Sequence, residues 1–199
     1  MIRKHAFPMT LLALLCAGPV AAQEAPKMTP EQLAMMEAYQ KAGTPGAQHQ
    51  QLAGLAGTYD LTVKGWHSPD APPTIDTGTA TRKMILGDRV MVEEVSSQMM
   101  GQPYSGQGLH GYDNVTGKYW ATWSDSMSTG LMLSEGTCDA NLACTYTGTY
   151  HDPVTKKPQT SRMTTRWTDK STEVFEMYGP GPDGKEAKMM EITYKKRAQ

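Results

Sequence analysis

From residue 57 onward, short stretches of β-branched and aromatic residues alternate with turn residues at regular intervals. Turn signals such as Ser68-Pro69-Asp70 and Asp152-Pro153 separate these stretches. No helical pattern of useful length intervenes, so the crossover connections that a parallel sheet needs are missing. The pattern predicts strands near 57–66, 77–86, 88–99, 104–112, 117–124, 128–136, 143–150, 159–168, 172–178 and 187–195.

These strands predict an all-β fold, an antiparallel meander of about ten strands. A sheet of this size tends to close into a barrel, because closure removes the unpaired edges. One or two short helices precede it. Thr29 can cap the first helix, Pro30 suits its first position, Gln32 completes a capping box and Gly43 can end it. A second short helix is expected over roughly 46–54.

The predicted strands have no face that is consistently apolar. In RVMVEEVSSQM, both alternating sets of residues mix valine or methionine with polar side chains. A solid core requires one dry face on every strand. Mixed faces favour a barrel whose interior is partly a polar cavity. The alternative is that the strands pair in another register, so that the two sets of alternating residues do not correspond to the two faces of the sheet in the way described.

The opening segment has the three parts of a secretory signal. Arg3 and Lys4 are basic, an apolar run follows, and small residues end at Ala22. Leu15 precedes Cys16, whereas a lipidated cysteine would follow a small residue, so we expect no lipid anchor. We expect cleavage after Ala22 and a periplasmic or secreted protein of the bacterial cell envelope. The apolar run is too short to span a membrane.

The chain therefore divides into three parts: a signal peptide over 1–22, a linker and N-terminal helix over 23–45, and the barrel domain over 46–199. The formal net charge of the whole chain is −1. No basic run or stripe is present, so nucleic acid and anionic membrane surfaces are not expected partners. The oligomeric state is left open.

Two cysteines, Cys138 and Cys144, lie beyond the predicted signal in CDANLAC. An even pair in an exported protein indicates a disulfide. Asp139 and Asn141 favour a turn between them, so the bridge would join the two arms of one hairpin. A redox-active pair would have two residues between the cysteines, and a metal pair would have a histidine nearby.

Several short motifs occur in a fixed order: His49-Gln-Gln-Leu52, Leu55-Ala-Gly57-Thr-Tyr59, Gly106-Gln-Gly108, Gly111-Tyr112-Asp113 and Trp123-Ser-Asp125. As an ordered set they resemble the bacterial family called domain of unknown function fifteen-seventy-nine, over about 47–197. The resemblance implies a calycin-type barrel, similar to lipocalins, fatty-acid-binding proteins and nitrobindins, and it implies no established activity. Nitrobindin-like barrels bind haem through a histidine near the C-terminal end. This chain has no histidine after His151, so we expect no haem and no other cofactor.

The segment GYDNVTGKYWATWSD contains aromatic and acidic residues around a predicted turn. A well-packed hairpin explains much of it, and Asp125 can cap a turn. The functional interpretation is that aromatic and polar side chains line a cavity. The candidate ligand-binding residues are His110, Tyr119, Trp123, Asp125, Arg166 and Trp167. No nucleophile elbow, phosphate loop or histidine pair at metal-ligand spacing is present, so no catalytic residue and no metal site is assigned.

These observations predict an exported barrel that binds a small, partly apolar molecule of unknown identity. Two alternatives remain. One is an enzyme of the hydrolase or isomerase type that uses the same cavity, with His110 or Asp125 as its base. The other is a structural protein of the envelope with a filled barrel. Methionine is abundant, with fifteen residues, and is expected mainly to line the core or pocket.

Overall fold

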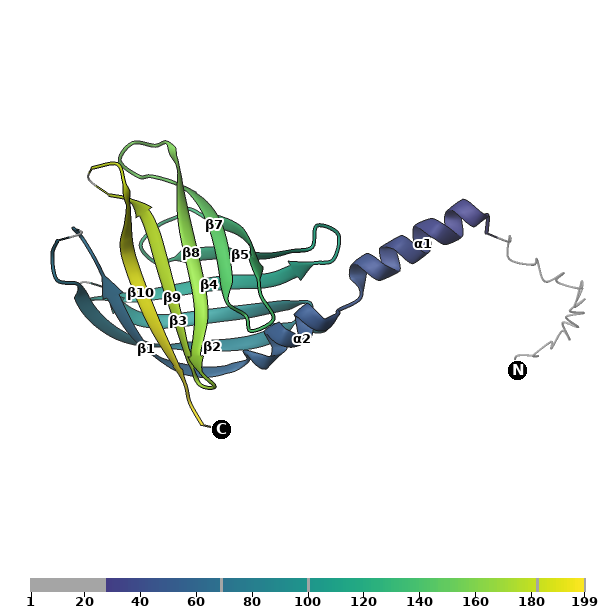
Figure 1. Ribbon diagram of the computed structural model, residues 1–199, viewed down its shortest axis with the longest axis horizontal. Coiled ribbons are helices and arrows are strands. Elements are labelled where there is room, and N and C mark those ends of the chain that lie inside the picture. Colours follow the sequence, from purple (N-terminus) through teal and green to yellow (C-terminus); the bar gives the residue numbers. More distant parts are fainter. Residues whose placement is uncertain (1–27, 69, 100, 182, 199) are drawn as a thin grey trace, which may run out of the picture.

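The computed structural model describes residues 28–198 apart from 69, 100 and 182. Its body is a closed barrel of ten antiparallel strands, preceded by two helices (Figure 1). The all-β meander expected from the alternation pattern is therefore confirmed. The predicted signal peptide over 1–22 lies outside the described residues. The elements are α1 (Pro30–Gly43), α2 (Ala47–Gly54), β1 (Gly57–Gly65), β2 (Thr74–Ile85), β3 (Val90–Met99), β4 (Gln102–Asp113), β5 (Lys118–Asp125), β6 (Met132–Cys138), β7 (Cys144–His151), β8 (Pro158–Asp169), β9 (Thr172–Pro180) and β10 (Glu186–Lys196).

The barrel closes because the first strand pairs with the last. Leu61 of β1 lies opposite Gly78 of β2 on one side and opposite Tyr194 of β10 on the other. Every other strand pairs with its neighbours in sequence. The hairpins β2–β3, β4–β5, β6–β7 and β8–β9 turn at the end where α2 lies, called the α2 end below. The remaining connections turn at the opposite, far end.

Helix α2 covers one end of the barrel by packing against β2, β3 and β4. Its buried residues are His49 and Leu52, which point away from solvent. The ring Nδ1 of His49 accepts a hydrogen bond from the Gly46 N–H at 3.0 Å, and this contact satisfies a donor at the helix start. A buried histidine here therefore caps a helix and packs edge-on against Tyr112.

Helix α1 projects away from the barrel, and none of its residues is buried (Figure 1). The predicted capping box is present, because Thr29 and Gln32 exchange side-chain and backbone hydrogen bonds. The Asn114 amide, in the β4–β5 turn, donates to the carbonyl oxygen of Thr44 at 2.8 Å and thus holds the end of this helix to the barrel. Within the described part of the chain, no helix is both long and apolar enough to cross a membrane.

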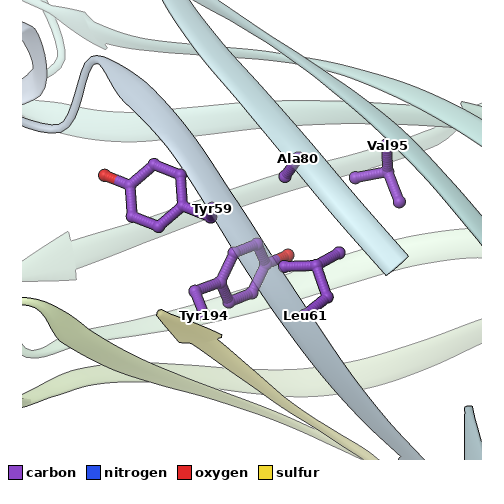
Figure 2. Packing of buried hydrophobic residues seen from close by; sticks show 5 residues of the cluster. All are labelled: Tyr59, Leu61, Ala80, Val95 and Tyr194. Carbon is purple, nitrogen blue, oxygen red and sulfur yellow. The ribbon is translucent and has the colours of Figure 1, made fainter. Parts of the chain in front are cut away.

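One cluster of buried apolar side chains comes from four adjacent strands, β10, β1, β2 and β3. Figure 2 shows this group, which consists of Tyr59, Leu61, Ala80, Val95 and Tyr194. Tyr59 is fully buried, and its hydroxyl donates to the Leu55 carbonyl oxygen at 2.6 Å. The core thus lies against one part of the wall and leaves space elsewhere in the barrel.

Candidate functional site

The barrel encloses a cavity of about 170 Å³. Leu52 and Leu55 border it at the α2 end. Most of its wall is apolar, and aromatic and methionine side chains contribute much of it. These are Met91, Met99, Tyr104, Tyr119, Trp123, Met132, Tyr146, Met163, Trp167, Phe175, Met190 and Tyr194. Methionine side chains adapt to irregular shapes, so such a wall suits a small molecule that is not tightly specified by shape.

A charged cluster interrupts this apolar wall, and it consists of Arg82, Glu93, Glu173 and His110. Arg82 Nε donates to Glu93 Oε1 at 3.0 Å, and Arg82 Nη1 donates to Glu173 Oε2 at 2.5 Å. The other Glu93 oxygen lies 3.2 Å from His110 Nε2. A carboxylate only accepts hydrogen bonds, so this nitrogen of His110 carries the hydrogen. All four residues border the cavity.

Two members of the cluster, Glu93 and Arg82, are buried, and their surroundings shift their pKa values in favour of the charged forms. Burial raises the pKa of Glu93, but the charge of Arg82 and the hydrogen bond from His110 outweigh it and hold the pKa at about 2. Burial lowers the pKa of Arg82, but the two carboxylates outweigh it and the pKa ends well above its ordinary value. Glu93 and Arg82 are therefore charged at neutral pH.

Two tyrosine rings cover the Arg82 guanidinium. Its central carbon lies 4.8 Å from the centre of the Tyr59 ring and 4.5 Å from that of Tyr194. Such cation–π contacts are favourable in a desolvated site. Burial raises the pKa of Tyr194 well above its ordinary value, so this ring remains a neutral partner. Rings and carboxylates together fix the position of the guanidinium.

A second polar group fixes one aromatic wall residue nearer the far end. Trp123 Nε1 donates to the Tyr104 hydroxyl at 3.1 Å and to Asp125 Oδ2 at 3.2 Å. The other Asp125 oxygen accepts from the Met127 N–H at 2.9 Å, so this carboxylate also caps the turn that follows β5. The indole lies over Gly106, where a Cβ atom would come within 2.3 Å of Trp123 Cζ2. Glycine at this position therefore provides the room for a flat ring on the wall.

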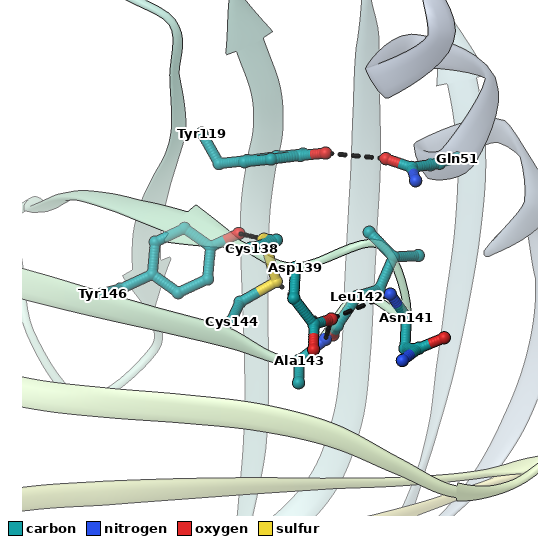
Figure 3. Close-up of a disulfide and its surroundings, with 9 residues drawn as sticks. All are labelled: Gln51, Tyr119, Cys138, Asp139, Asn141, Leu142, Ala143, Cys144 and Tyr146. Atoms are coloured by element: carbon teal, nitrogen blue, oxygen red, sulfur yellow. Dashed lines mark hydrogen bonds between the residues drawn. A yellow bond between two sulfur atoms is a disulfide. The ribbon is translucent and has the colours of Figure 1, made fainter.

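A disulfide closes the β6–β7 hairpin at the α2 end, as Figure 3 shows. Cys138 and Cys144 are bonded, which confirms the predicted pairing. Asp139 Oδ1 accepts from the N–H groups of Asn141 and Ala143, so the predicted turn residues form the loop. Both cysteines border the cavity. The disulfide therefore links β6 and β7 in the wall of the cavity, in addition to closing a surface loop.

Reducing this disulfide is expected to lower the free energy of unfolding by roughly 2 kcal/mol in the chain-entropy model, because the closed loop is short. The melting temperature should fall by roughly 4–8 °C for a chain of this size. Thermal unfolding with and without a phosphine reductant measures the effect. The double variant C138A/C144A is the control, since it should not respond to the reductant. An unchanged melting temperature on complete reduction of the wild type would contradict the prediction.

The structure places the six candidate ligand-binding residues in three different settings. His110, Tyr119, Trp123 and Trp167 border the cavity. Asp125 does not border it and instead holds the Trp123 indole from behind. Arg166 lies on the outer face, where its Nη1 donates to Glu176 Oε2 at 3.0 Å. Arg166 therefore does not line the cavity.

Three residues of the charged cluster, Arg82, Glu93 and Glu173, were not among the candidates predicted from the sequence. Glu93 and Glu94 are adjacent in a strand and point to opposite faces, so they do not form a carboxylate pair, and Glu94 is exposed. Glu173, the other carboxylate that accepts from Arg82, lies on β9, far along the chain. The one available signal was charged residues at alternating positions that otherwise carry apolar side chains, as in Met91, Glu93 and Val95.

No cluster of three or more histidine, cysteine, aspartate or glutamate residues that could hold a metal ion occurs among the residues the structure describes. No curated protein matches the chain. The family described as "Protein of unknown function (DUF1579)" matches residues 44–196, which span α2 and the complete barrel. The barrel is consistent with a calycin-like family, as the ordered motifs implied. With nearly the whole barrel domain covered, the chain belongs to the DUF1579 family.

Proposed function

We propose that this barrel binds one small, mostly apolar molecule in its interior. The observation that carries the proposal is the cavity of about 170 Å³, enclosed by aromatic and methionine side chains with a few polar groups at one side. Small-molecule sites in proteins commonly combine an apolar wall with a small number of fixed polar groups. An apolar cavity of about 150 Å³ holds a molecule the size of benzene. The expected ligand is therefore a single ring or a short chain.

The fixed geometry of the wall supports binding. Trp123 is held by Tyr104 and Asp125, and the hydroxyl of Tyr119 donates to Gln51 Oε1 at 2.9 Å (Figure 3). Side chains that are already ordered lose little entropy when a ligand arrives. Apolar contact with these rings would supply most of the binding free energy.

Two measurements test this proposal. Native mass spectrometry of the gently purified protein should reveal a small mass excess that disappears on denaturation. Toluene, a wholly apolar probe, should change the tryptophan fluorescence in a saturable titration, because Trp123 and Trp167 border the cavity. Replacing Ala121 with phenylalanine (A121F) should fill the cavity and abolish both signals. The matched variant S124F, on the outer face of the same strand, should retain them. Absence of both signals in the wild type would refute the proposal.

We further propose that the protein is exported and that Gln23 begins the mature chain. The basic start, the apolar run and the small residues up to Ala22 support this, and so does the disulfide, since such bonds persist in oxidising compartments. Intact-mass measurement of protein from the periplasm and medium of expressing bacteria tests it. A chain that retains residues 1–22 and stays in the cytoplasm would contradict it.

A further inference from the structure

We infer that the ligand carries a protonated amine, which Glu173 holds, and that carboxylic acids are excluded from the cavity. This inference rests on the proposed binding function and adds the chemical class of the ligand. It comes from the way the charged cluster distributes its contacts around the cavity.

The arginine of the cluster is already occupied. Arg82 donates to a carboxylate from Nε and to another from Nη1, and tyrosine rings cover its guanidinium. A free arginine in an apolar cavity would attract an anionic ligand through paired hydrogen bonds. Here Glu93 and Glu173 take that place. A ligand carboxylate would have to displace one of them and leave it buried without its partner.

The net charge of the cluster also favours a cationic ligand over an anionic one. Glu93, Glu173 and Arg82 sum to a formal −1 with His110 neutral, and to zero with His110 protonated. The cluster is positive in neither state. An ionised group in a poorly solvated cavity is unfavourable unless an opposite charge meets it. The cavity therefore offers a counter-charge to a cation and none to an anion.

Glu173 is the member of the cluster that remains open to a ligand. Its Oε2 accepts from Arg82, whereas no described residue donates to its Oε1. The only fully buried side-chain polar atom without a partner in the described structure is Ser161 Oγ, so Glu173 Oε1 touches free space. Glu173 is 5% exposed and borders the cavity, and that free space is therefore the cavity. This oxygen can accept a hydrogen bond from a bound ammonium group.

The neighbours of Glu173 suit the apolar part of such a ligand. Trp167 lies directly opposite Glu173 on the adjacent strand, and Phe175 follows on the same face of β9. Aromatic faces attract cations, most strongly in desolvated sites. An amine on a ring of benzene size would thus meet a carboxylate at its charged end and rings around its body.

Four probes of nearly the same shape test the inference on the wild-type protein at neutral pH: toluene, benzyl alcohol, benzylamine and benzoate. Tryptophan fluorescence titrations give their dissociation constants. Benzylamine should bind at least about tenfold more tightly than benzyl alcohol, since a hydrogen bond to a charged group is stronger than a neutral one. Benzoate should bind most weakly. Benzoate binding as tightly as benzylamine would overturn the inference.

Substituting the carboxylate separates its role from that of the cavity. E173Q should weaken benzylamine about tenfold or more and leave toluene nearly unchanged. E176Q is the matched control on the same strand, because Glu176 pairs with Arg166 and Lys188 outside the barrel. Equal benzylamine affinity in E173Q and wild type would also overturn the inference. If E173Q does not fold, the order of the four probes on the wild type decides alone.

The outcomes distinguish this inference from the function on which it rests. If toluene binds and benzylamine has no advantage, the barrel binds small molecules but Glu173 does not select amines. If none of the four probes binds, the proposed function and the inference both fail. Retained benzylamine binding in A121F would place the amine outside the cavity and would also refute the inference.

Discussion

Replacing Arg82 with methionine should lower the free energy of unfolding by about 3–5 kcal/mol at neutral pH. The substitution leaves Glu93 and Glu173 buried, with 3% and 6% of their side chains exposed, and without their shared cation. Removing one partner of a buried ion pair is costly because the remaining charge is neither hydrated nor paired. Urea-induced unfolding followed by tryptophan fluorescence measures the change, and urea avoids the charge screening that a guanidinium salt would cause.

Two controls show whether the charge itself is responsible. R162M removes an arginine that also contacts a carboxylate and a tyrosine ring, but on the outer surface, so it should cost less than about 1 kcal/mol. The triple variant R82M/E93L/E173L removes the buried charges together and should recover most of the lost stability. If R82M and R162M are equally destabilising, or if the triple variant is no more stable than R82M, the cluster does not act as described.

Acid should destabilise the protein through Glu93 in a defined range. The Glu93 pKa is held at about 2 in the folded protein, against an ordinary value of 4.5. The ion pair therefore contributes its full stability above about pH 4.5, and this is lost as the pH falls towards about 2. In that range the unfolded chain binds a proton that the folded protein does not. At 1.36 kcal/mol per pKa unit, the contribution of this one residue is about 3 kcal/mol.

The variant E93Q isolates this contribution. It cannot titrate at this position, so its stability should vary less steeply between about pH 4.5 and 2 than that of the wild type. Other carboxylates titrate in both proteins, and the difference between the two curves removes their effect. The measurement is urea unfolding at a series of pH values. Parallel curves for E93Q and wild type would mean that Glu93 has the same pKa in the folded and unfolded states.

The architecture was predictable because it depends on local patterns. The alternation of residues and the turn residues predicted all ten strands. The capping residues Thr29, Pro30 and Gln32 predicted the start of α1. The charged cluster was not predictable in the same way. Arg82 and Glu93 face each other across a hairpin, but Glu173 reaches them only because the sheet closes on itself. A meander expected to close does not by itself specify which interior side chains meet.

Adjacent candidates illustrate a second limit. Arg166 and Trp167 must point to opposite faces of β8, and the sequence does not say which face is the interior. The structure places Trp167 inside and Arg166 outside. Likewise, a turn was expected within GYDNVTGKYWATWSD, but the amide contact from Asn114 in this turn to Thr44 depends on where α1 ends in space. Such roles come from tertiary packing and carry no local pattern.

Because β1 pairs with β10, the wall of the barrel does not depend on which strand comes first in the chain. Lys196 Nζ donates to the Gly54 carbonyl oxygen at 3.0 Å, and the Arg197 N–H donates to the Thr58 carbonyl oxygen at 2.9 Å. These contacts place the end of β10 beside the end of α2 and the start of β1. A linker that runs back along the length of α2 can therefore join β10 to the start of α2, and new chain ends can be opened in the loop 152–157 at the far end. Such a circular permutant keeps every strand pairing. It would place a fused reporter domain beside the far end of the cavity, opposite α2 and the disulfide.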